Sequence, residues 1–135
     1  MRFTSCLAGS ILSLALLAGA ARATTSECPA KTTATDEIVA ILKDAPNCER
    51  AMKLLEACEY SASGDAQFGA VVEKKCEADF LDHLKAPRKL TYQRELRVCD
   101  RKYRNEEGTM YVSFTAFCRA EVAQRYSRQA LTAGH

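Results

Sequence analysis

The feature that most constrains this fold is a set of widely spaced cysteines carried on predicted helices. Seven cysteines occur in 135 residues, and six of them follow residue 23. Such use of cysteine is typical of an oxidising compartment. The gaps between successive members of the six are 19, 9, 17, 22 and 18 residues. Because structural zinc sites use close pairs such as C-x2-C, the spacing favours disulfides and argues against a bound metal.

Residues 1–23 have the features of a cleaved secretory signal peptide. Arg2 gives a positive start, residues 7–21 are uncharged and mainly apolar, and Ala21-Arg22-Ala23 supplies small residues where a signal peptidase reads. The apolar run is shorter than the roughly 20 residues of a permanent anchor; the alternative interpretation is a buried N-terminal helix. Cys6 precedes the run, so we expect no lipidation. The sequence predicts a periplasmic or secreted protein that does not span the membrane.

The remaining chain has helical periodicity throughout and predicts an all-α bundle of four to five helices. No window alternates as a strand would. After a polar lead-in at 24–34, we expect one disulfide-bonded domain over 35–131. Breaks at Pro46-Asn47, Ser63-Gly64, Ala86-Pro87 and Gly108 divide it. The first expected helix runs from a cap at Thr35 or Asp36 to Ala45, and the second from a cap at Asn47 to about residue 61. The third covers about 66–85. The fourth runs from Pro87 to the Gly108 turn, and the last follows a cap at Thr109.

Each predicted helix after the first carries its cysteines on its apolar stripe. On the first helix the expected stripe is Ile38, Ile41, Leu42 and Ala45. The later stripes are Cys48, Met52, Leu55 and Cys58; then Phe68, Val72, Cys76, Phe80 and His83; then Tyr92, Leu96, Cys99 and Tyr103; and finally Phe114, Cys118 and Val122.

Helix geometry narrows the 15 full pairings that six cysteines allow. Cys99 lies nine residues before Gly108 and Cys118 ten after it, so the two are level in an antiparallel pair. Around the turn near residue 62, Cys48 and Cys76 are also level, whereas Cys58 is offset by roughly 15 Å along the helix axis. The favoured pairing is Cys99–Cys118, Cys48–Cys76 and Cys28–Cys58. Tilted helices would allow the alternative, Cys58–Cys76 with Cys28–Cys48.

The sequence contains no catalytic motif. G-x-S-x-G, HExxH, the P-loop and G-x-G-x-x-G are all absent. On the predicted third helix, Asp79 lies four residues before His83, a spacing that brings two side chains together. Such a pair could orient a general base, or it could be a partly buried histidine paired for stability. We favour the second interpretation and predict a non-enzymatic protein without a cofactor.

The best candidate binding residues are four arginines on the predicted fourth helix. Their spacing of three, four and three residues places them on one face, away from the apolar stripe: Arg94, Arg97, Arg101 and Arg104. Guanidinium groups suit two-pronged contact with carboxylates or phosphates. The simpler interpretation is a solvated face partly paired with the acidic third helix.

Charge is distributed unevenly along the chain after the leader. Residues 24–84 carry 6 basic and 12 acidic side chains, and residues 85–135 carry 11 and 5. The domain therefore has no net charge but divides into a −6 half and a +6 half. These halves can pair with each other, or one can be presented to a partner. Export and zero net charge argue against nucleic acid as that partner.

The turn at residues 105–111 is a second candidate for contact. Tyr103, Met110, Tyr111 and Phe114 surround it, and loops on stiff scaffolds often carry recognition. The alternative is that Tyr111 and Phe114 begin the core face of the last helix.

The C-terminal part of the chain resembles the LprI-type lysozyme-inhibitor family of small exported bacterial proteins. The resemblance rests on Gln93-Arg94 and Cys99, followed by Cys118, Tyr126, Arg128 and Leu131, together with a leader and paired cysteines on helices. It implies a helix-rich inhibitor of lysozyme, without assigning inhibitory residues.

We therefore predict an exported, monomeric, non-enzymatic protein that binds or inhibits an anionic protein through a polar helical face. The alternative is an envelope or structural protein that contacts anionic lipid or polymer through its basic helix 88–104. An enzyme is the third hypothesis.

Overall fold

The computed structural model describes residues 27–59 and 64–134. The predicted signal peptide, with Cys6, lies outside these residues. The described part is all-α, as predicted, and contains no strand. Its elements are α1 (Thr35–Asp44), α2 (Cys48–Cys58), α3 (Asp65–Glu77), a 3₁₀ turn η1 (Leu81–His83), α4 (Ala86–Lys102) and α5 (Thr109–Ala133).

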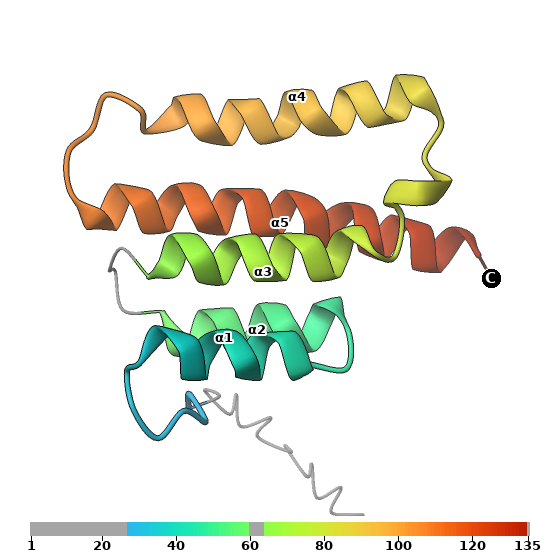
Figure 1. The fold of residues 1–135 in the computed structure, drawn as a ribbon. Helices are drawn as coiled ribbons and strands as arrows, with labels where there is room; N and C mark the ends of the chain where they lie inside the picture. Colours follow the sequence, from blue (N-terminus) through green and yellow to red (C-terminus); the bar gives the residue numbers. More distant parts are fainter. Residues whose placement is uncertain (1–26, 60–63, 135) are drawn as a thin grey trace, which may run out of the picture.

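The longest helix, α5, organises the bundle. It packs against α2, α3 and α4, and its interface with α3 is the most extensive. Figure 1 shows α4 and α5 as an antiparallel pair, with α1 and α2 on the side of α3 that faces away from α4. The core is one cluster of apolar side chains from all five helices. α4 is therefore an outer helix, with one face on α5 and the other exposed.

The three disulfides follow the pairing that helix register favoured. Cys28 is bonded to Cys58, Cys48 to Cys76, and Cys99 to Cys118. The first disulfide holds the segment before α1 against α2, the second joins α2 to α3, and the third joins α4 to α5. The alternative with Cys58–Cys76 and Cys28–Cys48 is not formed.

Two predicted helix starts are confirmed and two are wrong. Asn47 caps α2 by accepting a hydrogen bond from the backbone N–H of Arg50 at 2.9 Å, and a proline occupies the first turn of α4. Neither Thr35 nor Asp36 caps α1, whose N-cap residue is Ala34. Thr109 does not cap α5 either. It is the first helical residue, and Gly108 precedes it with a φ of 113°.

The carboxylate of Glu37, in the first turn of α1, binds the segment that precedes the helix. It accepts hydrogen bonds from the backbone N–H groups of Lys31 and Thr32, at 2.8 and 3.2 Å, and from the Thr32 hydroxyl at 2.6 Å. These bonds, the Thr32 hydroxyl first, hold the pKa of Glu37 below its usual value. The lead-in is thus folded back on the first turn of α1.

The predicted third helix, 66–85, is too long. α3 ends at Glu77, and the chain turns before η1. Phe80 leaves the helical path and packs against Tyr92 and Tyr126, with ring centroids 5.1 and 5.5 Å apart. Asp79 meanwhile accepts a hydrogen bond from the hydroxyl of Ser127. These contacts with α4 and α5 outweigh continuation of the helix, and they leave His83 exposed rather than on an inner stripe.

The inner face of α5 also differs from the prediction. Val122 is buried as expected and Cys118 is half-buried, but Phe114 is 38% exposed. The buried face instead contains small residues, among them Ser113, Ala116 and Ala120. Because α3 approaches α5 closely at Gly69, small side chains occupy the interface and the large Phe114 lies outside it.

Candidate binding surface

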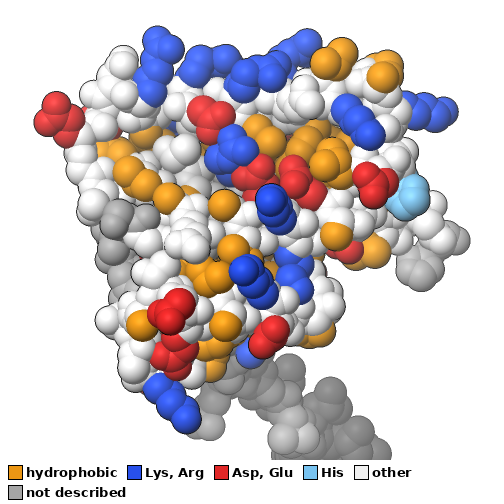
Figure 2. Space-filling view, in the orientation of Figure 1, with side chains coloured by type: hydrophobic (Ala, Val, Ile, Leu, Met, Phe, Trp, Pro, Cys, Tyr) orange, Lys and Arg blue, Asp and Glu red, His pale blue; other side chains and the backbone are white. Residues whose placement is uncertain are grey.

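Three of the four predicted arginines lie on the outer side of α4. Arg104 does not, because the helix ends at Lys102 rather than continuing to the Gly108 turn as expected, and Arg104 lies in the turn that follows. We call the set of four the arginine face: Arg94, Arg97, Arg101 and Arg104, all of which are exposed. The buried residues Tyr92, Leu96 and Cys99 are on the opposite side of the same helix. In Figure 2, lysine and arginine side chains line the edge of the molecule that α4 forms. Arg94, Arg97 and Arg101 span roughly 10 Å along the helix axis.

Both carboxylates of α4 are engaged by α5. Glu95 accepts a hydrogen bond from the Tyr126 hydroxyl at 2.9 Å and forms an ion pair with Arg125. Asp100 accepts two hydrogen bonds from Arg119, at 2.8 and 3.0 Å. Within the described residues, no arginine of the arginine face forms an ion pair. The expected partial pairing with the acidic third helix is therefore not formed there.

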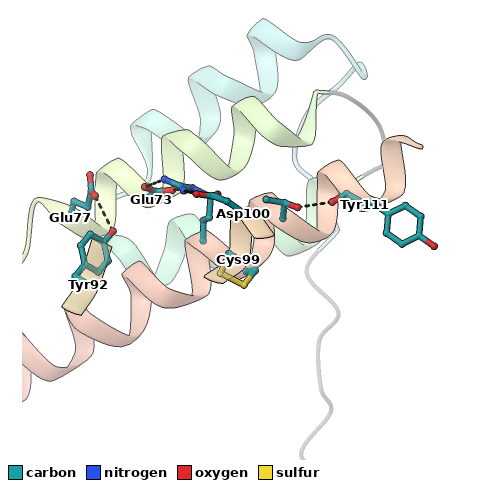
Figure 3. Close-up of polar contacts among 9 residues, drawn as sticks. Glu73, Glu77, Tyr92, Cys99, Asp100 and Tyr111 are labelled. Carbon is teal, nitrogen blue, oxygen red and sulfur yellow. Dashed lines mark hydrogen bonds and ion pairs between the residues drawn. A yellow bond between two sulfur atoms is a disulfide. The ribbon is translucent and has the colours of Figure 1, made fainter. Parts of the chain in front are cut away.

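The carboxylates of α3 point to other partners. Glu73 pairs with Arg119 of α5 through two hydrogen bonds of 2.8 Å. Glu77 accepts a hydrogen bond from the Tyr92 hydroxyl at 2.9 Å, and Figure 3 shows both arrangements. Burial, followed by the bond to Glu77, raises the pKa of Tyr92; burial also raises the pKa of Glu77. Arg119 bridges α3 to α4, a role that no local sequence signal indicates, since Glu73 is 46 residues away.

Two exposed apolar residues accompany the arginine face. Leu90 is 59% exposed and Val98 is 52% exposed. Leu90 is four residues before Arg94, so it continues the same line along the helix. Neither residue belongs to the predicted apolar stripe or to the row of arginines, so neither pattern indicated it.

The polypeptide between α4 and α5 forms an aromatic tip. Tyr103, Tyr111 and Phe114 have ring centroids 5.6 to 6.0 Å apart. Beside them is a surface cavity of about 230 Å³. Its lining residues are Tyr103, Arg104, Glu106, Tyr111, Val112 and Thr115. Tyr111 and Phe114 therefore contribute to the tip, and not to the main core as the alternative expected.

The candidate general base is not assembled. His83 is exposed in η1, and Asp79 is hydrogen-bonded to Ser127 on α5. Both residues line a surface cavity of about 390 Å³, but no hydrogen bond joins them among the described residues. The early end of α3 removes the four-residue helical spacing on which the pairing rested.

The described residues offer neither a free thiol nor a metal-binding cluster. All six of their cysteines are in disulfides. No group of three or more His, Cys, Asp or Glu side chains lies close enough within 27–59 and 64–134 to hold a metal ion. Over the same ranges, no helix is sufficiently long and apolar to cross a membrane.

Comparisons of the chain with family models, with curated proteins and with solved structures found no match.

Proposed function

We propose that this is an exported, non-enzymatic protein that binds or inhibits an acidic partner protein through the arginine face. The observation that carries the proposal is a set of four exposed arginines, three on the outer face of α4 and one in the turn after it, without ion-pair partners among the described residues. Three disulfides suit an oxidising destination such as the periplasm or the exterior.

The rigidity of α4 supports binding, because a preorganised surface loses less conformational entropy when a partner docks. α4 is tied to α5 by Cys99–Cys118 and by the pairs of Glu95 and Asp100 with α5. Carboxylates are the natural protein partners of such a row, since arginine contacts them through two parallel hydrogen bonds.

Affinity capture tests the proposal. Oxidised residues 24–135 serve as bait for envelope and host-secretion extracts at low and high salt. Changing all four arginines of the arginine face to Glu is expected to abolish capture of the acidic partner without changing the melting temperature, because all four side chains are exposed. High salt is expected to weaken capture, since exposed charges are screened.

The matched control reverses four exposed basic residues elsewhere: Lys43, Arg50, Lys53 and Lys85 to Glu. This control makes the same change in net charge but leaves the arginine face unchanged, so it should still capture the partner. Equal loss in both variants, or equal capture by both, would refute the arginine face as the site. Lysozyme in the wild-type eluate would support the LprI-type resemblance.

The second candidate is an envelope role in which residues 88–104 contact anionic lipid or polymer. It is favoured by the apolar residues that lie exposed near the basic helix, namely Met110, Val112 and Phe114 at the tip. Four Arg→Lys substitutions on the arginine face separate the two candidates. They retain the charge that anionic vesicles attract, but remove the two-pronged geometry that carboxylates use.

A further inference from the structure

The arginine face runs directly into the cavity at the aromatic tip. Arg104 is the last member of the face, and it is also a lining residue of the cavity of about 230 Å³. A segment that follows the arginines toward the C-terminal end of α4 therefore reaches this cavity. The inference below rests on the proposed function and specifies what kind of segment would bind.

The cavity suits one apolar side chain. Its volume is below the roughly 300–1,000 Å³ of pockets for small-molecule ligands. Its walls include the rings of Tyr103 and Tyr111, 5.9 Å apart, and the side chain of Val112. Aromatic rings prefer offset or edge-to-face contact at such separations.

The charged residues around the cavity determine which side chains of a partner are favoured at each position. Arg104 attracts a carboxylate, whereas Glu106 on the lining disfavours a second one. The ammonium group of Lys102 lies 5.0 Å from the Tyr103 ring, so the basic side of the tip extends beyond Arg104. A neutral side chain is consequently favoured inside the cavity and an acidic one beside Arg104.

Two local features define the backbone on the α5 side of the cavity. The hydroxyl of Thr115 donates a hydrogen bond to the carbonyl oxygen of Tyr111 at 2.9 Å. The turn before α5 contains Gly108 in a conformation with φ 113° and ψ 155°, which is essentially restricted to glycine. The cavity thus exists before a partner arrives.

We propose that the Tyr103–Tyr111 cavity takes a single aromatic side chain of the acidic partner, next to the carboxylate that pairs with Arg104. The partner segment is then an acidic run that ends in an aromatic residue. The arginines supply attraction and the cavity supplies the anchor, in the manner of a buried aromatic anchor within a polar rim.

Labelled peptides test this inference by fluorescence anisotropy. The first peptide consists of six glutamates, a glycine and one phenylalanine. The second peptide has alanine in place of the phenylalanine. The pair is made with the variable residue at either end, so that both directions of the bound segment are sampled. For wild-type protein, the phenylalanine peptide is expected to bind about tenfold more tightly than the alanine peptide, because one aromatic side chain is partly buried.

Two variants locate the effect. Tyr111→Ala and Val112→Ser each remove part of the cavity wall without touching the arginine face. Both should bind the alanine peptide as the wild type does and should lose the preference for phenylalanine. Leu131→Ser is the control, since Leu131 is also exposed but lies near the other end of α5.

The outcomes separate the two proposals. Equal binding of both peptides by the wild type would overturn the cavity anchor and leave the arginine face supported. A preference that survives in both cavity variants would also overturn it. Binding of neither peptide, with binding to phosphatidylglycerol vesicles, would overturn the acidic-partner proposal and the anchor together, in favour of the lipid surface.

Discussion

At Gly69 the backbone of α3 approaches α5 so closely that a side chain has no room. A Cβ atom built there would lie 2.7 Å from the Cβ atom of Ala116 and 2.9 Å from its carbonyl oxygen. This contact lies in the most extensive interface of the bundle. A small side chain is therefore required at Ala116, and the large Phe114 lies outside this interface.

We expect Gly69→Ala to lower the free energy of unfolding by about 1–3 kcal/mol, the usual effect of overpacking. Chemical denaturation of the oxidised protein measures it. Gly64→Ala is the control, because a Cβ atom there would be no closer than 3.4 Å to Phe68 and Thr35. A Gly69→Ala protein as stable as the wild type would show that α3 and α5 separate at little cost.

Glu77 makes stability depend on pH in an unusual direction for a carboxylate. Burial raises its pKa above the ordinary value of 4.5, so the folded protein binds this proton more tightly than the unfolded chain. Ionisation of Glu77 as pH rises therefore opposes folding. Gln retains an oxygen that can accept the Tyr92 hydrogen bond without the charge. We expect Glu77→Gln to be more stable than wild type at pH 7, and the difference to vanish as pH falls below about 4.

Glu49→Gln is the opposite control. The hydrogen bond from Arg128 lowers the pKa of Glu49, so its ionised form favours folding above its unfolded pKa and that contribution is lost in acid. Glu49→Gln should lose stability at pH 7 and approach wild type at low pH. Melting curves of both variants across pH 3–8 would contradict this account if the two differences had the same sign.

At the scale of elements, the positions of the cysteines relative to the turns predicted the pairing of helices correctly, whereas apolar periodicity predicted the end of the third helix wrongly. Cys99 and Cys118 are bonded because nearly equal distances from a turn place them level in an antiparallel pair, and this argument needs no tertiary information. Periodicity predicted that the third helix continues past Glu77, but Phe80 and Asp79 contact α4 and α5. Those contacts join residues more than ten positions apart, so a local pattern cannot contain them.

The Cys99–Cys118 disulfide should be a major tie between α4 and the bundle. Replacing both cysteines with alanine is expected to lower the free energy of unfolding by about 3 kcal/mol, the loop-entropy value for a closed loop of some 20 residues. Urea denaturation of the variant against the oxidised wild type measures the loss. An unchanged midpoint would mean that the other α4–α5 contacts suffice.

For the whole molecule, the uneven charge distribution is partly neutralised by ion pairs within the bundle. Two basic residues of α5 pair with acidic residues of the first half, in Glu73–Arg119 and Glu49–Arg128. The arginine face remains exposed, whereas Arg88 at the start of α4 donates a hydrogen bond to Gln129. The three- and four-residue spacing was sufficient to predict the positions of Arg94, Arg97 and Arg101 but not that of Arg104, because the helix ends at Lys102. The cavity at the tip was not predictable, because it depends on how the turn at Gly108 places Tyr111 beside Tyr103.

The disulfides also divide the polypeptide into two separately crosslinked segments. Two bridges lie within residues 28–76 and the third within 99–118, and no bridge among the described cysteines crosses between them. A protease that cuts once between α3 and α4 would therefore produce two separate chains, each still internally crosslinked. They would remain together in native buffer through the α3–α5 interface, and would come apart in denaturant without any reductant.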